Sequence, residues 1–101
     1  MSYAEIDPII RAWSQKHGFT LFERVEGDPT PVRSVYLSSP QGACFQIWID
    51  QPRSSQVALH AADVETRDDE ELRQDWSVPV SSLAVALDHA VLHVREWMGR
   101  K

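Results

Sequence analysis

The spacing of apolar residues changes twice along this chain, and these changes restrict the fold more than any other feature. Near the start, apolar residues recur at helical spacing: Ile6, Ile9, Ile10 and Trp13. This spacing predicts an amphipathic helix, and Gly18 is suited to end it because glycine readily adopts left-handed backbone angles. From Phe19 the apolar period becomes two, which is typical of strands. After Pro79 the helical period returns.

Two start signals precede the first helix. Ser2 and Glu5 have the spacing of a capping box. Asp7 followed by Pro8 has the pattern of an N-cap with proline at the first helical position. Because proline inside a helix removes a hydrogen bond, we expect the regular helix to begin at Asp7, after a looser turn.

The middle of the chain predicts a meander of short strands. Strands are expected over residues 19–25, 32–38, 43–49 and 56–64, separated by turns that contain proline, glycine or serine. A fifth, edge strand is expected over residues 72–78, ended by Pro79. Short strands joined by short turns pair with their sequence neighbours in antiparallel fashion.

A long second helix is expected after Pro79, capped by Ser81 or Ser82 and closed by Gly99. Its core-facing stripe consists of Leu83, Ala86, Leu87, Ala90, Val91, Val94, Trp97 and Met98. At 101 residues the chain is expected to form a single domain. The predicted fold is therefore α+β, an antiparallel β-meander of four to five strands with an N-terminal and a C-terminal helix packed on one face.

Strand alternation assigns the side chains of the sheet to two faces. The more uniformly apolar face, which the helices are expected to cover, consists of Leu21, Val35, Leu37, Phe45, Ile47, Ile49, Val57 and Leu59. The other face is mixed and consists of Phe22, Arg24, Tyr36, Cys44, Gln46, Trp48, Ala58 and His60. Burial of the apolar face contributes about 1.5–3 kcal/mol for each large side chain, so this face drives folding.

The mixed face is the candidate binding surface. Each of its strands carries one large ring: Phe22, Tyr36, Trp48 and His60. If the strands pair in meander order, these four rings form a diagonal row across an open sheet. Tyrosine and tryptophan are enriched in interfaces, and exposed apolar patches mark them. Two alternatives remain: cross-strand aromatic pairs that support the sheet, and coverage of this face by loops or chain ends.

The net charge of the chain restricts the classes of partner that it is expected to bind. The net charge is −5, from 15 acidic and 10 basic side chains, which argues against nucleic acid because its phosphates are negative. An acidic surface attracts basic proteins, although the same charge also maintains solubility. An acidic run is interpreted either as a solvated loop or as an electrostatic contact for a basic partner: Asp68, Asp69, Glu70 and Glu71.

Other features of the sequence indicate the cellular compartment in which the protein is expected. The sequence has no apolar run of about 18 residues, and its start lacks the basic and apolar regions of a secretory signal. Cys44 has no second cysteine with which to form an internal disulfide, which fits a reducing compartment. We therefore expect a cytoplasmic protein without a membrane partner.

Residue patterns typical of catalysis or cofactor binding are weak. The four glycines are too scattered for a phosphate-binding loop, so no cofactor is expected. His89 and His93 share a helical face and would bind a metal with help from His60 or Asp88, but such a pair is common by chance. Cys44 would act as a nucleophile only if His60 lay beside it. No catalytic or metal site is predicted, and a small metal-binding or enzymatic domain using His60, His89 and His93 stays an alternative.

Four segments carry a resemblance to a known family: residues 45–49, the strand end at 62–66, the acidic segment through Glu71, and the closing helix at 83–97. In their order they resemble the small immunity proteins of bacterial polymorphic toxin systems, in particular the TriTu-type group. The turn at 51–54 departs from the shorter, glycine-containing turn expected there. The resemblance implies a cytoplasmic bacterial protein that binds and neutralises a toxin domain without a cofactor, and it assigns no role to individual residues.

Two other binding functions stay open. Type III secretion chaperones are also small, acidic and cytoplasmic, and they act as dimers, but they place a helix between strands where this sequence predicts none. Self-association through the open sheet face would give a homodimer. The sequence therefore predicts a non-enzymatic protein-binding domain, most concretely an immunity-type inhibitor of a basic toxin domain.

Overall fold

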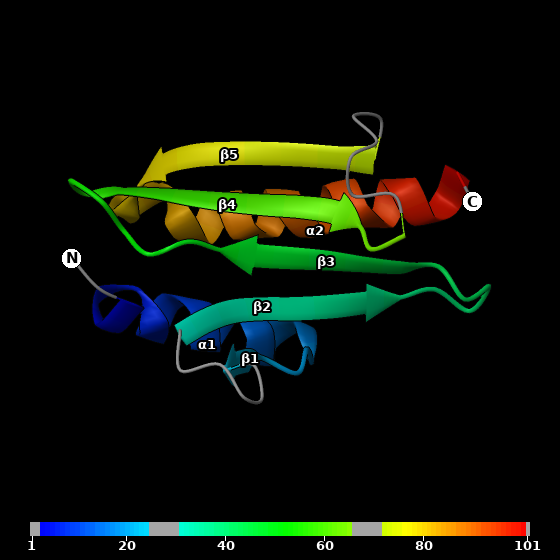
Figure 1. Cartoon of the computed structure of the whole chain (residues 1–101), viewed down its shortest axis with the longest axis horizontal. Coiled ribbons are helices and arrows are strands. Elements are labelled where there is room, and N and C mark those ends of the chain that lie inside the picture. The colour runs from blue at the N-terminus through cyan, green and yellow to red at the C-terminus, as the bar shows by residue number, and fades with distance from the viewer. Residues whose placement is uncertain (1–2, 25–30, 66–71, 101) are drawn as a thin grey trace.

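The strands and helices of the chain are arranged as two layers in the computed structural model, which describes residues 3–24, 31–65 and 72–100 (Figure 1). The helices are α1 (Asp7–His17) and α2 (Leu83–Arg100), each preceded by a short 3₁₀ turn, η1 (Tyr3–Glu5) and η3 (Val80–Ser82). The strands are β1 (Phe22–Arg24), β2 (Pro31–Ser38), β3 (Cys44–Ile49), β4 (Gln56–Asp63) and β5 (Arg73–Pro79).

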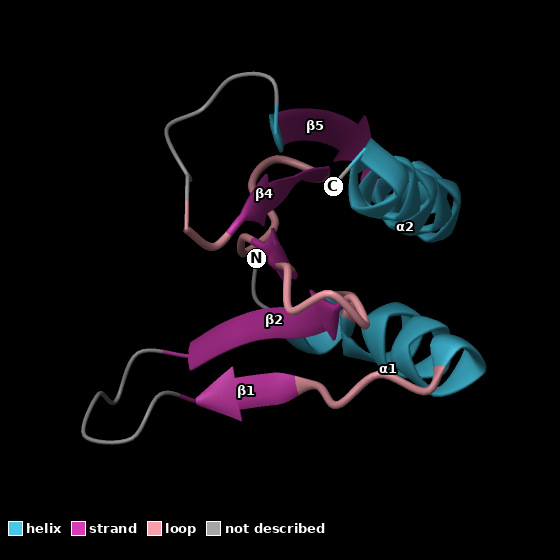
Figure 2. Cartoon of the chain, turned by 90° about the vertical axis from the view of Figure 1, so that its right-hand side faces the viewer, coloured by secondary structure: helices cyan, strands magenta, loops and turns pink. Residues whose placement is uncertain are grey.

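The strands form one antiparallel sheet in the order β1-β2-β3-β4-β5. Both helices lie on the same side of this sheet, with α1 beside β1 and β2 and α2 beside β4 and β5 (Figure 2). The predicted α+β meander, its fifth strand and the one-sided placement of the helices are therefore confirmed. Among the described residues, no helix lies on the opposite side of the sheet.

The apolar side of the sheet forms the core with both helices. The predicted apolar face is confirmed, since its side chains on β2, β3 and β4 are buried, while Leu21 is only partly buried against the core. Both helical stripes contribute fully buried side chains to this layer: Ile6, Ile10, Leu83, Leu87, Val91 and Val94. Because the apolar residues alternate in the strands, burying them on one side directs their neighbours to the other side.

The ends of the first helical segment differ in part from the prediction. Helix α1 begins at Asp7, but the N-cap position is Ile6, and no side-chain hydrogen bond caps the helix. The prediction of Asp7 as the N-cap was therefore wrong, and the Ser2 of the predicted capping box lies outside the described residues. Gly18 ends the helix in the left-handed region, with φ of 72°, as expected.

Strand β1 is shorter than predicted because the backbone before it closes the helix. The Phe19 N–H donates to the Ser14 carbonyl at 2.8 Å, so it is not available to pair with β2. The Phe19 ring lies 5.2 Å from the His17 ring and 5.4 Å from the Trp13 ring. The residues just after α1 therefore pack against the end of the helix, and pairing between β1 and β2 starts at Phe22.

The second helix differs from the prediction at its C-terminal end. At its start, Ser81 and Ser82 are the last residues of η3, and Ser82 directly precedes Leu83, the first residue of α2, so a serine occupies the predicted cap position. The Val80 N–H donates to the Ser55 carbonyl at 3.0 Å, which ties this turn to the β3–β4 connection. Gly99 lies within α2, which continues to Arg100, so the expected closure at Gly99 was wrong.

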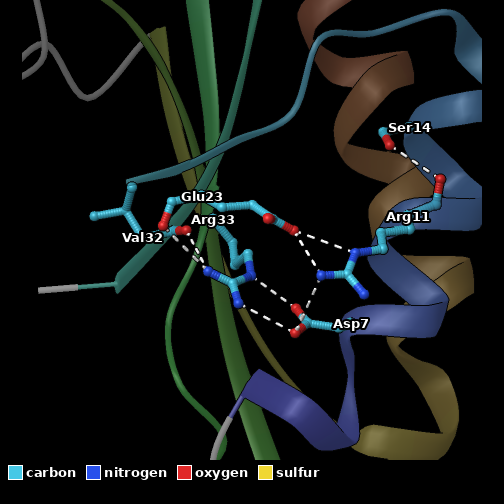
Figure 3. A network of polar contacts seen from close by, with 6 residues as sticks. All are labelled: Asp7, Arg11, Ser14, Glu23, Val32 and Arg33. Atoms are coloured by element: carbon cyan, nitrogen blue, oxygen red, sulfur yellow. Dashed lines mark hydrogen bonds and ion pairs between the residues drawn. The ribbon is translucent and has the colours of Figure 1, made fainter. Parts of the chain in front are cut away.

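Arg33 of β2 is the centre of a partly buried polar network (Figure 3). Its Nε donates to Asp7 Oδ1 at 2.7 Å and its Nη2 donates to Asp7 Oδ2 at 3.1 Å. Its Nη1 donates to the carbonyls of Val32 at 2.8 Å and of Glu23 at 3.3 Å. The Arg33 and Asp7 side chains are 10% and 12% exposed, so this bidentate ion pair is largely shielded from water. It joins the first turn of α1 to the sheet.

Further contacts extend this network. The Tyr3 ring lies 4.4 Å from the guanidinium carbon of Arg33, and its hydroxyl donates to the Ile49 carbonyl at 2.7 Å. Arg11, one turn after Asp7, donates to Glu23 Oε1 at 2.9 Å and 3.2 Å. Together these contacts connect η1 and α1 to β1, β2 and the end of β3.

A second, more exposed ion-pair cluster joins the two helices. Lys16 Nζ donates to the Asp88 carboxylate at 2.8 Å, and His17 Nε2 lies 3.1 Å from the same carboxylate. Hydrogen bonding by Lys16 and, next, by His17 holds the pKa of Asp88 below its ordinary value, although burial acts in the opposite direction. The Asp88 side chain is 41% exposed, so solvent screens this cluster and it contributes little to stability.

We predict that Asp7→Asn lowers the free energy of unfolding by about 3 kcal/mol at neutral pH, because it leaves the Arg33 charge partly buried without its partner. Hydrogen bonds from Arg33 hold the pKa of Asp7 below its ordinary value of 3.8. The contribution of the pair is therefore complete above about pH 5 and is lost as the pH falls through the lower pKa of the folded state. Urea unfolding at several pH values measures both effects.

The matched control is Asp88→Asn, which removes an exposed ion pair and should cost less than about 1 kcal/mol. The difference in stability between wild type and Asp7→Asn should shrink in acid. Equal losses in the two variants at neutral pH would contradict the structural role assigned to Asp7 and Arg33.

Candidate protein-binding face

The open face is defined here as the side of the sheet that faces away from α1 and α2. Of the mixed set expected from alternation it carries Phe22, Tyr36, Cys44, Gln46, Trp48, Ala58 and His60, and it adds Ser34, Arg73 and Asp75. Phe22 and Tyr36 are the large apolar side chains of this face that are most exposed, at 44% and 42%. Their rings are in contact, with centroids 5.6 Å apart in a T-shaped arrangement. This pair forms a continuous aromatic patch at the β1–β2 end of the open face.

The other two rings form a separate pair. Trp48 and His60 lie directly opposite each other on β3 and β4, and their rings stack with centroids 5.0 Å apart. Strand register places Ser34 opposite both Phe22 and Trp48, whereas Tyr36 lies opposite Gln46. The four rings therefore do not form the predicted diagonal row. Phe22, Trp48 and His60 lie on one line across the strands, and Tyr36 lies two residues further along β2 from that line.

His60 is held between two carboxylates. Its Nδ1 lies 2.6 Å from Asp75 Oδ1 on β5, and its Nε2 lies 2.8 Å from Asp50 Oδ2 just after β3. The histidine side chain is 17% exposed, whereas the Asp50 and Asp75 side chains are about half exposed. Because a carboxylate only accepts, both contacts are hydrogen bonds only when both ring nitrogens carry a proton.

Arg73 completes this cluster from β5. Its Nη2 donates to Asp75 Oδ1 at 3.3 Å, and its guanidinium carbon lies 5.7 Å from the Trp48 ring centre. Hydrogen bonding by His60, and next by Arg73, holds the pKa of Asp75 below its ordinary value, while burial acts in the opposite direction. We call Asp50, His60, Arg73 and Asp75 the charged cluster of the open face.

Sequence reasoning missed Asp50 and Asp75 as partners of His60. Strand alternation could have placed both carboxylates on the face of His60, since Asp50 follows Trp48 by two residues and Asp75 lies within the predicted fifth strand. Alternation gives the face of a side chain but not its neighbour on the next strand. Only the register, with His60 opposite Asp75, brings the three side chains together.

Cys44 and His60 share the open face but do not meet. Cys44 lies opposite Ser38 at the start of β3, whereas His60 lies opposite Trp48, four residues further along that strand. Each strand residue adds roughly 3.3 Å, so the two side chains are separated by about 13 Å along the strand. The structure therefore does not form the cysteine–histidine pair that nucleophilic catalysis would require.

The histidines considered for a metal site lie on opposite sides of the sheet. His93 packs against Trp76 and Trp97 on the helix side, with ring centroids 5.4 Å and 6.1 Å apart. His89 and His93 line a shallow depression of about 300 Å³ on α2 with Leu92 and Glu96. His60 is on the open face, so the three histidines cannot bind one ion. Among the described residues, no group of three or more His, Cys, Asp or Glu side chains is placed to hold a metal.

The acidic run of the predicted binding surface lies outside the described residues: Asp68, Asp69, Glu70 and Glu71. None of the described helices is long and apolar enough to cross a membrane.

No protein-family model matches the chain, and no curated protein or solved structure matches it significantly.

We predict that His60→Ala raises the pKa of the Asp75 carboxyl toward its ordinary value of 3.8, because it removes the hydrogen bond that contributes most to the lowered pKa. Arg73→Ala should raise it less, since the bond from Arg73 is the weaker contribution. Carboxyl carbon NMR shifts followed through an acid titration measure both changes. An Asp75 pKa that is the same in wild type and His60→Ala would show that the histidine does not hold this carboxylate.

Proposed function

We propose that the protein is a non-enzymatic protein-binding domain that contacts its partner through the open face. The observation that carries this proposal is the exposed pair of touching rings, Phe22 and Tyr36, on the side of the sheet without helices. Aromatic side chains supply large contact areas at little cost in conformational entropy, and tyrosine is enriched among residues that dominate binding energy.

The framework below this patch supports a preformed binding surface. The patch lies on β1 and β2, which are tied to α1 through Arg33, Asp7 and Glu23. Binding to such a surface orders few additional groups, which keeps the entropic cost of association low. The exposed apolar residues on α2, Val85 and Leu92, are single aliphatic side chains without an exposed aromatic neighbour, so they make a poorer anchor.

For the partner we propose a basic protein, most concretely a bacterial toxin domain that this chain neutralises in the cytoplasm. The net charge of −5 favours encounter with a basic surface. The immunity function rests on the resemblance of the strand and helix order to the TriTu-type group.

Two alternative binding functions differ in their expected assembly. A type III secretion chaperone would form a dimer, and such chaperones place a helix between strands. Among the described residues the two α-helices, α1 and α2, lie before β1 and after β5, which favours the immunity-type proposal. A homodimer through the open face would bury Phe22 and Tyr36 against a second copy. Light scattering separates a dimer from a monomer that binds another protein.

We predict that the double variant Phe22→Ala, Tyr36→Ala weakens partner binding by about thirtyfold or more, which corresponds to a loss of at least about 2 kcal/mol for a central anchor. The partner is captured from a lysate of the source organism with immobilised wild-type protein, identified by mass spectrometry and purified. Calorimetric titration then gives the dissociation constant for each variant.

The matched control is Val85→Ala, Leu92→Ala, which removes apolar side chains on α2 that are even more exposed than Phe22 and Tyr36. It should bind as wild type does. A larger loss of partner affinity in this control than in the Phe22→Ala, Tyr36→Ala variant would place the binding site on α2. If the wild type captures no other protein and forms a dimer, and the Phe22→Ala, Tyr36→Ala variant is a monomer, self-association would replace the proposal.

A separate prediction concerns the acidic segment. Charge reversal at Asp68, Asp69, Glu70 and Glu71 should lower the association rate at low salt and change the dissociation rate little, because exposed charges act mainly on encounter. Stopped-flow association at two salt concentrations measures this effect. A rate that is independent of both the substitutions and the salt would exclude electrostatic steering by this segment.

A further inference from the structure

Strand β5 forms an edge of the sheet that lacks the protection found at the other edge (Figure 1). The opposite edge, β1, is three residues long, and its pairing with β2 is interrupted by a register shift. Strand β5 is seven residues long and pairs with β4 without such a shift. It contains no lysine, and Pro79 is its last residue. Short, irregular or lysine-bearing edges resist pairing with other chains, whereas long regular edges promote it.

The hydrogen-bond ladder shows which backbone groups of β5 point away from β4. Ala58 lies opposite Ser77, and the Ala58 carbonyl accepts a hydrogen bond from the Asp50 N–H, on the β3 side, at 2.9 Å. Ser77 therefore forms a non-hydrogen-bonded pair with Ala58, and its own N–H and carbonyl point outward. Because this direction alternates along a strand, the N–H and carbonyl groups of Arg73 and Asp75 also point outward. The outer edge of β5 thus presents donors and acceptors for a further strand.

The side chains of β5 are complementary to those of a second, antiparallel copy of the same strand. Arg73 and Asp75 carry opposite charges two residues apart on the open face. Antiparallel pairing about Gln74 places Arg73 of each copy opposite Asp75 of the other, so that charges alternate around the four side chains. The same register brings Trp76 of each copy to Leu72 of the other on the helix side, where both pack against the core. Opposite charges and apolar pairs directly across a ladder stabilise strand pairing.

The backbone favours the same register. The outward groups of Arg73 face those of Asp75 in the other copy, and the two-fold axis repeats this pair, which gives about four hydrogen bonds. Two neighbouring registers are less favourable. Pairing centred on Asp75 places two carboxylates opposite each other, and pairing centred on Trp76 places Arg73 opposite Pro79, which has no N–H to donate.

We propose that the protein forms a symmetric homodimer in which β5 of one copy pairs antiparallel with β5 of a second copy about Gln74, so that two five-stranded sheets become one continuous sheet. The interface is a sheet edge with few side chains, so the dimer is weak and reversible. This assembly goes beyond the proposed function. Phe22 and Tyr36 lie on β1 and β2, far from β5 in the sheet, so the dimer leaves the open face of both copies uncovered.

Sedimentation equilibrium of the whole chain over a range of concentrations measures the dissociation constant of the dimer. Arg73→Glu places acidic side chains opposite each other at two symmetric positions. It should raise the dissociation constant about tenfold or more, because two cross-strand pairs change from attraction to repulsion. The matched control is Arg53→Glu, which makes the same change of charge at an exposed arginine in the β3–β4 connection and should leave the constant nearly unchanged.

Disulfide trapping tests the register independently. Residues opposite each other in a non-hydrogen-bonded pair have Cα atoms about 4.5 Å apart, a separation that a disulfide spans. Gln74→Cys should therefore form a disulfide-linked dimer on mild oxidation. Ser77→Cys changes an exposed residue of the same strand, but its two copies are about 20 Å apart in this register, so it should remain unlinked. Wild type, with Cys44 as its single cysteine, should also remain unlinked.

Three results would overturn the proposal: a wild type that stays monomeric up to about 1 mM, equal dissociation constants for Arg73→Glu and wild type, or equal crosslinking of Gln74→Cys and Ser77→Cys. A dimer abolished by Phe22→Ala, Tyr36→Ala would place the interface on the open face instead. A monomeric wild type that loses its captured partner on Arg73→Glu would assign the β5 edge to a strand of that partner.

Discussion

Burial of alternate side chains on β3 is the constraint on which the rest of the structure depends. Phe45, Ile47 and Ile49 are inaccessible to solvent or nearly so, and β3 is the central strand of the sheet. Helices α1 and α2, from the two ends of the chain, cover this side, so the core lies between the sheet and both helices. The side chains between the buried ones, Gln46 and Trp48, are thereby directed to the face without helices.

The position of α1 on this core depends on a polar contact as well as on apolar packing. The Asp7–Arg33 ion pair is largely buried, and such pairs specify an arrangement more than they stabilise it, because desolvation offsets much of their attraction. Its bidentate geometry sets the start of the helix relative to β2. Since β2 also carries Tyr36, the same strand joins the core, the helix and the exposed aromatic patch.

Much of the fold could be predicted from local patterns, and much of the candidate site could not. The helical stripes, the five strands and the buried side of the sheet follow from periods of about 3.6 and 2. Phe22, Tyr36, Trp48 and His60 were assigned to the correct face by the same reasoning. Cross-strand aromatic pairs were among the predicted alternatives, but which rings pair was not predicted, because alternation determines the side of a side chain but not its neighbour on the next strand.

The sequence by itself determined the fold class, the order of the strands and the composition of each sheet face, because these depend on spacing along one chain segment. Tertiary structure decided the contacts between segments distant in sequence. Asp7, predicted as a helix cap, instead pairs with Arg33, and Asp50 and Asp75 enclose His60 through the register of β3, β4 and β5. Register depends on the combined packing of several strands and turns, so no local pattern contains it.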